Sequence, residues 1–134
     1  MMFATYVGSI TQEVRTCMIK PKDPRELAEA ILSRSVCAVQ VGAAIVDRKG
    51  RILSWGWNSS GPDGYGMHAE HHAILRANLK RLRGATIYVA SQRNRNQKCI
   101  NSKPCEACHT IIKWAKLSCC YRDAQGDWQI IYKL

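Results

Sequence analysis

The stretch that decides the fold is residues 68–108, HAEHHAILRANLKRLRGATIYVASQRNRNQKCINSKPCEAC. Its apolar residues recur at helical spacing over 68–82, and a β-branched and aromatic run follows over 86–91. A polar, basic loop over 92–103 then leads to Pro-Cys, and proline suits the first turn of a helix, expected over 104–116. The stretch therefore predicts a helix, a strand, a loop and a helix in succession.

The remaining regular elements flank this stretch. We expect them at 24–34 (helix), 38–47 and 51–57 (strands), and 118–122 and 128–133 (strands). Asp23 is a candidate cap for the first helix, and the turn at 48–50 makes the first two strands a hairpin. Residues 58–67 are predicted to form a loop. The connection at 123–127 is too short for a parallel crossover of about a dozen residues, so the closing strands should run antiparallel.

The order α-β-β-α-β-α-β-β predicts an α/β fold, in which a single five-stranded mixed sheet is flanked by helices. The 134 residues suffice for one domain, 1–134, of which residues 1–22 form an N-terminal extension of unclear structure. A hydrophobic fraction of 46% and a charged fraction of 22% exclude disordered, collagen-like and disulfide-built classes. No apolar run approaches the ~18 residues of a membrane span, and residues 1–10 lack the basic and apolar regions expected of a secretory signal. We therefore expect a cytoplasmic protein that contacts no membrane.

The chain has twenty Lys and Arg against ten Asp and Glu, a formal net charge of +10. Such an excess favours an anionic partner, whether a nucleic acid, a nucleotide or an acidic surface, although many basic proteins have no such partner. Seven cysteines cannot all pair within one chain. Without an export signal, their spacing indicates metal binding or catalysis before disulfides.

Two short motifs lie where a loop is expected to enter a helix: His68-Ala69-Glu70 and Pro104-Cys105-Glu106-Ala107-Cys108. Two cysteines three residues apart at a helix start lie on the same side, so both sulfurs can bind one zinc ion at ~2.3 Å. His68 supplies an imidazole from the other helix start. Three ligands leave one tetrahedral position open, which indicates a catalytic rather than a structural zinc. Glu70 is close enough to move protons between water and a leaving group.

Together these motifs resemble the H-x-E…P-C-x-x-C signature of the zinc-dependent cytidine and deoxycytidylate deaminase superfamily, over roughly residues 37–134. The resemblance implies a cytidine deaminase-like α-β-α sandwich in a small single-domain member with a hairpin C-terminus. It also implies that His68, Cys105 and Cys108 hold Zn²⁺ and that Glu70 shuttles protons. Hydroxide on the zinc would attack C4 of cytosine or C6 of adenine, and ammonia would leave.

Substrate contacts are expected from two further places. Gly56-Trp57-Asn58 resembles the G-W-N of tRNA adenosine deaminases, where the asparagine contacts the nucleoside, so Asn58 and Trp57 are candidates, with Ala69 between the motif residues. Arg93 and Arg95 lie in the basic loop before the zinc cysteines, where a cationic rim suits a phosphate. That loop contains no aromatic residue for stacking bases.

The favoured interpretation is a deaminase that converts the cytosine of a free nucleotide or nucleoside, of the dCMP or cytidine type, to uracil. One alternative is a deaminase of cytosine or adenine in single-stranded nucleic acid or tRNA. Another is a non-catalytic zinc module that binds nucleic acid. Dimers and tetramers are common among relatives, so a homo-oligomer is among the expected partners.

Other interpretations of the same residues stay open. A structural zinc could be closed by Cys99 or His109 as a fourth ligand, and His72 could be a second imidazole ligand. Cys105-x-x-Cys108-His109 also has the spacing of a c-type haem attachment site, and a thioredoxin-like dithiol is a further reading. Three tryptophans fall on predicted apolar faces and are expected in the core: Trp55, Trp114 and Trp128.

Overall fold

A computed structural model describes residues 23–60 and 66–132 of the chain. The N-terminal extension at 1–22 and the middle of the loop at 58–67 lie outside these residues. The helices are α1 (Pro24–Ile31), followed by a 3-10 turn at Leu32–Arg34, α2 (Ala69–Arg76), α3 (Leu79–Leu82) and α4 (Glu106–Trp114). The strands are β1 (Val39–Val46), β2 (Ile52–Trp57), β3 (Thr86–Arg93), β4 (Ser118–Arg122) and β5 (Trp128–Tyr132).

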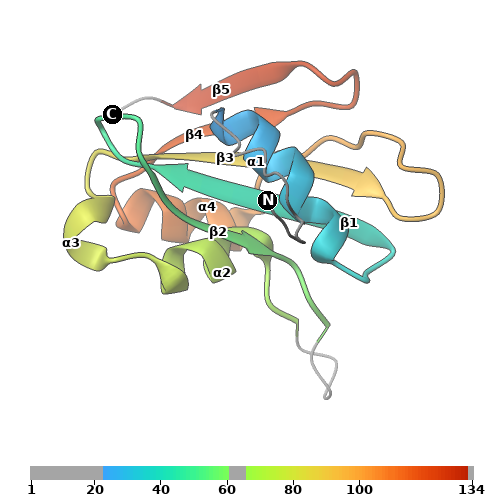
Figure 1. The fold of residues 1–134 in the computed structure, drawn as a ribbon, viewed down its shortest axis with the longest axis horizontal. Helices are drawn as coiled ribbons and strands as arrows, with labels where there is room; N and C mark the ends of the chain where they lie inside the picture. The colour runs from blue at the N-terminus through green and yellow to red at the C-terminus, as the bar shows by residue number, and fades with distance from the viewer. Residues whose placement is uncertain (1–22, 61–65, 133–134) are drawn as a thin grey trace, which may run out of the picture.

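The strands form one five-stranded mixed sheet in the order β2-β1-β3-β4-β5 (Figure 1). All neighbouring strands pair antiparallel except β3 and β4, which are parallel. The predicted sheet, the β1–β2 hairpin and the antiparallel closing strands are therefore confirmed. α1 also begins as predicted, because the Asp23 side chain accepts a hydrogen bond from the Arg25 backbone N–H at 2.9 Å.

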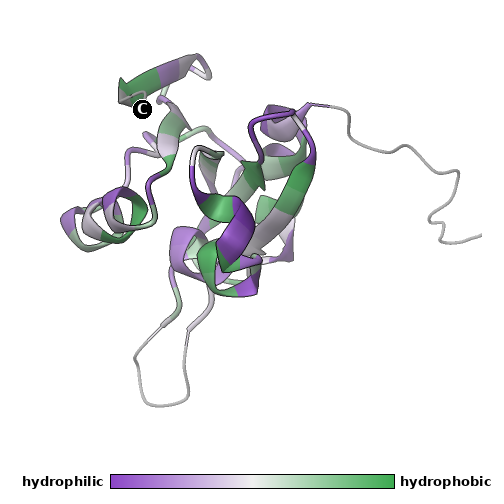
Figure 2. Cartoon of the chain, turned by 90° about the vertical axis from the view of Figure 1, so that its left-hand side faces the viewer, coloured by the Kyte–Doolittle hydropathy of each residue, from purple (hydrophilic) through white to green (hydrophobic). Residues whose placement is uncertain are grey.

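Two hydrophobic clusters hold the layers together, one on each face of the sheet. The larger joins α2 and α4 to the sheet through buried side chains that include Ala73, Ile112 and Ile87. The smaller joins α1 to the sheet through Ala28, Leu32 and other apolar residues. Figure 2 shows hydrophobic segments in the central strands, whereas hydrophilic and hydrophobic segments alternate along the helices. This is the predicted sandwich of helices around a sheet.

The predicted single helix over 68–82 is wrong, because the structure divides it into α2 and α3. The backbone is extended at Ala77 (φ −85°, ψ 153°), and α2 ends there. The Asn78 side chain then accepts a hydrogen bond from the Lys80 backbone N–H at 3.0 Å and begins α3. Asparagine favours such a cap over a helix interior, because its side chain competes for backbone hydrogen bonds.

The expectation that Trp114 lies in the core is also wrong. Its side chain is 71% exposed at the end of α4, beside the exposed apolar residues Leu75 and Leu79. Trp55 and Trp128, by contrast, pack against the smaller core cluster as expected. Helical spacing predicts an apolar face but does not show whether another element covers it.

Close packing of α2 on β2 positions the first motif. A Cβ atom on Gly56 of β2 would lie 2.5 Å from the Ala73 backbone nitrogen and 2.8 Å from the Ala69 carbonyl oxygen, so only glycine allows this approach. On the same strand, the Ser54 hydroxyl donates a hydrogen bond to the Ala73 carbonyl at 2.6 Å. The start of α2 is therefore held against the sheet.

Within the described ranges, every helix is too short or too polar to cross a membrane.

Candidate metal centre

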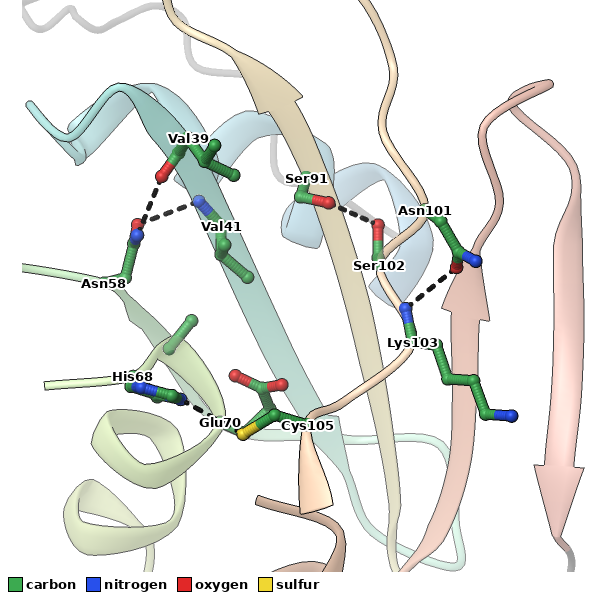
Figure 3. A pocket seen from close by; sticks show the side chains of 11 residues that line it. Val39, Val41, Asn58, His68, Glu70, Ser91, Asn101, Ser102, Lys103 and Cys105 are labelled. Atoms are coloured by element: carbon green, nitrogen blue, oxygen red, sulfur yellow. Dashed lines mark hydrogen bonds between the residues drawn. The ribbon is translucent and has the colours of Figure 1, made fainter. Parts of the chain in front are cut away.

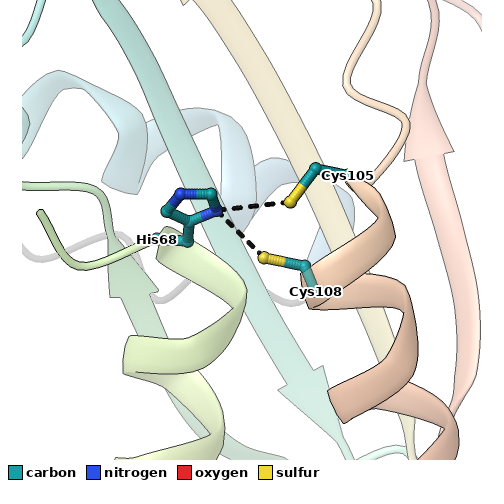
Figure 4. A group of neighbouring side chains, drawn as sticks. All are labelled: His68, Cys105 and Cys108. Carbon is teal, nitrogen blue, oxygen red and sulfur yellow. Dashed lines mark hydrogen bonds between the residues drawn. The ribbon is translucent and has the colours of Figure 1, made fainter.

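Three predicted ligands meet at one end of the sheet, although they are far apart in sequence. His68 Nδ1 lies 3.1 Å from Cys108 Sγ, 40 positions away, and 3.6 Å from Cys105 Sγ, 37 positions away. The ligand atoms of these three residues all lie within 4.8 Å of one another. Figure 4 shows the imidazole of His68, at the start of α2, facing the two sulfurs at the start of α4.

The spacing of these atoms fits one tetrahedral zinc ion. Zn–S and Zn–N bonds of ~2.3 and ~2.0–2.1 Å place a nitrogen and a sulfur about 3.6 Å apart across a tetrahedral edge. His68 is the N-cap residue of α2, and Cys105 is the N-cap residue of α4. Neither side chain caps its own helix, so both stay available to a metal. The positive ends of both helix dipoles also favour thiolate ligands here.

The thiol of Cys108 needs a cation to ionise. Burial raises the pKa of this thiol well above its ordinary value, and the neighbouring Glu70 carboxylate raises it further. A metal ion between the ligand atoms supplies the opposite charge that stabilises the thiolate form. The donor set therefore suits zinc in its chemistry as well as in its spacing.

Glu70 is a buried carboxyl beside the ligand cluster. It lies in the first turn of α2, and only 5% of it is exposed. Burial raises the pKa of this carboxyl, because the charged form loses its hydration, while the nearby His68 acts in the opposite direction. Figure 3 shows its carboxylate pointing into a cavity, close to Cys105 and His68. A carboxyl in this setting can both accept and donate a proton.

The cavity has a volume of about 210 Å³ and opens beside the ligand cluster (Figure 3). It is lined by Val39, Val41, Asn58, His68, Ala69, Glu70, Ser91, Asn101, Ser102, Lys103 and Cys105. Its walls come from the start of β1, the ends of β2 and β3, and the starts of α2 and α4. The strand ends and helix starts of an α/β sheet form ligand crevices in this way.

Asn58 lines the cavity while it also extends the pairing of β1 and β2. Its side chain accepts a hydrogen bond from the Val41 backbone N–H and donates one to the Val39 carbonyl, both at 2.8 Å. An amide has two donors and two acceptor lone pairs, so one of each is left for a ligand. Ala69, another predicted substrate contact, is fully buried and also lines the cavity.

Trp57, Arg93 and Arg95 do not line this cavity, so their contact with a substrate stays a prediction. The Trp57 ring packs edge-on against His72, with 4.8 Å between ring centroids. His72 Nδ1 lies 3.2 Å from the backbone nitrogen of Trp57 and is not part of the ligand cluster. The imidazole of His72 therefore supports the end of β2 rather than a metal.

Several cavity residues were not identified from the sequence. The hydroxyls of Ser91 and Ser102 lie 2.8 Å apart, and the Ser102 backbone N–H donates to the Arg122 carbonyl at 2.9 Å. These bonds fasten the loop before α4 across the ends of β3 and β4. Ser102 lies just before the Pro-Cys motif, which is the signal for its place in the cavity, and Lys103 belongs to the basic loop that the sequence marked as a cationic rim.

Among the described residues, three side chains could hold a metal ion at this centre. Cys99 and His109, the suggested closing ligands of a structural site, do not belong to the cluster. Cys99 instead forms an isolated β-bridge with Gln92. A tetrahedral zinc ion held by these three residues would keep a fourth position for water or a substrate, as in catalytic zinc sites.

Comparison with known families identifies the chain. The family described as the cytidine and deoxycytidylate deaminase zinc-binding region matches residues 23–122, which are 100 of the 134 residues. The chain belongs to this family. It is accordingly a zinc deaminase of the cytidine and deoxycytidylate type, as the two motifs predicted.

Solved structures share the fold. A cytidine deaminase from Burkholderia pseudomallei superposes with a TM-score of 0.65 at 23% identity, covering 80% of this chain and 87% of that one. A dCMP deaminase from the cyanophage S-TIM5 gives 0.58 at 24% identity, covering 75% and 79%. A cytidine deaminase from Mycobacterium leprae gives 0.53 at 21% identity, covering 79% and 88%. No curated protein matches the chain.

The ligand set predicts how zinc content responds to substitution. Cys108→Ser removes one of three ligands, and we expect zinc affinity to fall by at least about tenfold, since even changes around a metal ligand cost that much. Zinc per chain is measured by mass spectrometry after dialysis against a weak chelator. Cys99→Ser is the matched control and should keep its zinc. Equal zinc in wild type and Cys108→Ser, or loss in Cys99→Ser, would contradict the assignment.

Proposed function

We propose that this protein is a hydrolytic deaminase that converts the cytosine of a free nucleotide or nucleoside to uracil and ammonia. In this proposal His68, Cys105 and Cys108 hold zinc, Glu70 moves protons, and Asn58 contacts the substrate. The observation that carries the proposal is the buried Glu70 carboxylate, which points into the cavity beside the three-ligand cluster. A purely structural zinc has no use for a carboxylate in that place.

A zinc ion held by His68, Cys105 and Cys108 would supply Lewis acidity, which lowers the pKa of bound water from ~15.7 towards ~7. Deamination replaces the amino group on C4 by the oxygen of water, so two protons of that water must move. Glu70 accepts each in turn, delivering the first to ring N3 and the second to the amino group, which leaves as ammonia. N3 keeps its proton, so uracil and ammonia account for all atoms. The raised pKa of Glu70 suits both transfers.

The size of the cavity supports a single free base as the reacting group. About 210 Å³ lies below the ~300–1,000 Å³ of common ligand pockets, so little room is left for neighbouring nucleotides. Lys103 at its edge is exposed, with its amine turned away from His68 (Figure 3). A flexible ammonium there can bind a phosphate that stays outside the cavity. The similar structures are a cytidine deaminase and a dCMP deaminase, which agrees with either substrate.

One feature favours the alternative substrate, a base in single-stranded nucleic acid or tRNA. The guanidinium carbons of Arg34 and Arg76 lie 5.3 and 5.7 Å from the centre of the Trp57 ring, next to Asn58. Aromatic rings among cations are typical of surfaces that bind single strands. Both guanidinium groups already lie over the Trp57 ring, however, which leaves less of its face for stacking a base. We therefore retain the free nucleotide or nucleoside as the substrate.

A homo-oligomer is supported by the exposed apolar patch formed by Leu75, Leu79 and Trp114. These side chains are 62%, 65% and 71% exposed, and they border an apolar groove between α2 and α4. Apolar patches of this kind mark interaction surfaces more often than free surface. The cytoplasmic location stays a prediction from the sequence.

Glu70→Gln should abolish most turnover without removing the metal. Glutamine keeps the shape of the side chain but cannot carry protons, so we expect the rate to fall by about 10²–10⁴-fold. Ammonia release is measured with cytidine, dCMP and a cytosine-containing oligonucleotide. Zinc content and thermal stability of the variant are the controls and should be unchanged. Undiminished turnover in this variant would refute the proposed role, and turnover of the oligonucleotide alone would refute the proposed substrate.

Lys103→Ala should distinguish a nucleotide from a nucleoside substrate. If Lys103 binds a phosphate, KM for dCMP rises by about tenfold, which corresponds to ~1.4 kcal/mol, while KM for cytidine changes less than twofold. Steady-state ammonia release with both substrates measures the difference. Lys98→Ala removes the same charge from the same loop and should affect neither KM. Equal effects of Lys103→Ala on both substrates would show that no phosphate is bound there.

A further inference from the structure

A second cavity, of about 200 Å³, lies at the opposite end of β1 from the metal centre. All the residues that line it are charged: Asp47, Arg48, Lys49, Arg51, Lys80, Arg81 and Arg83. They come from the turn between β1 and β2 and from α3 with the residue after it. Val41 lines the first cavity and Asp47 the second, and the six steps of ~3.3 Å between them along the chain amount to about 20 Å. The two cavities are therefore distinct sites.

The one carboxylate of this cavity is already used to build it. Asp47 accepts hydrogen bonds from the backbone N–H groups of Lys49 and Arg51, both at 2.9 Å. It also pairs with the guanidinium groups of Arg51 at 3.0 Å and Arg81 at 2.9 Å. Asp47 thus orders the turn and ties α3 to it. The walls of the cavity are held in place before any ligand arrives.

The other four cations, Arg48, Lys49, Lys80 and Arg83, have no carboxylate partner in the described part of the chain. The Arg48 side chain packs over Gly84, where a Cβ atom on that glycine would lie 2.7 Å from Arg48 Cδ. Six cations around one carboxylate leave an excess of five positive charges in one concavity. Charges this close repel one another, since the Debye length is ~8 Å at physiological ionic strength. A multivalent anion would relieve this repulsion.

We propose that this second cavity is a binding site for a compact polyphosphate, that is, a short chain of phosphoryl groups. Guanidinium and ammonium groups bind phosphoryl oxygens through charge-assisted hydrogen bonds. The cavity is small and concave, which suits a short chain with several charges close together. A nucleic-acid backbone carries its charges along an extended line and would need a longer basic track. The site lies outside the deaminase cavity and does not depend on the reaction proposed there.

Inorganic tripolyphosphate is the probe, titrated by calorimetry into the zinc-loaded protein at constant ionic strength. We expect it to bind at least tenfold more tightly than orthophosphate, and the double variant Lys80→Ala/Arg83→Ala to weaken it at least tenfold. Both side chains are exposed, so the fold should survive, and circular dichroism checks this. Tripolyphosphate also chelates metals, but extraction of zinc would not depend on Lys80 or Arg83.

The matched control is Arg95→Ala/Lys98→Ala, which removes two positive charges at the opposite end of the molecule. Its affinity for tripolyphosphate should stay within twofold of wild type. The proposal is overturned if tripolyphosphate binds no better than orthophosphate, if the Lys80/Arg83 variant binds it normally, or if the control loses it instead. Tighter binding of a twelve-nucleotide oligothymidylate than of tripolyphosphate, lost in the Lys80/Arg83 variant, would assign the cavity to nucleic acid and also overturn it.

Discussion

The proposed function depends on one imidazole and two sulfurs that lie within 4.8 Å of one another. In the sequence, Cys105 and Cys108 are 37 and 40 positions away from His68. The topology explains this. The chain runs from α2 through α3 into β3, and α4 then connects β3 to β4, which lies parallel to it. Both helices therefore begin at the same end of the sheet. Each places a ligand at its N-cap position, where the side chain is free of the helix and the helix dipole is positive. The metal centre is thus a consequence of topology as much as of motif.

The same arrangement explains why an acidic group tolerates burial. Glu70 lies in the first turn of α2, where it loses hydration but faces His68, Cys105 and the metal position. Removing a carboxylate from water disfavours its charged form, and a nearby cation favours it again. A group balanced between these effects exchanges protons readily, whereas an exposed carboxylate stays ionised. Burial is therefore part of the chemistry and not merely a consequence of packing.

The sequence predicted most of the strands to within two residues, because β-branched runs and short turns mark them locally. It also predicted that His68, Cys105 and Cys108 lie together, since the two motifs that contain them mark helix starts. It did not predict the break at Asn78 or the exposure of Trp114, because helical spacing does not reveal local caps or missing neighbours. The net charge of +10 likewise did not show where on the protein an anion would bind. Lys103 is the one Lys or Arg at the first cavity, among the described residues, whereas six line the second.

X-ray absorption spectroscopy of the zinc-loaded protein tests the central claim most directly. The account predicts an average of two sulfur neighbours at ~2.3 Å and two nitrogen or oxygen neighbours at ~2.0–2.1 Å. One of the light neighbours should be exchangeable, so that an added small anion changes the spectrum of the wild-type protein. Three or four sulfur neighbours, or a spectrum that no added anion alters, would mean that a further side chain closes the site and would contradict a catalytic centre.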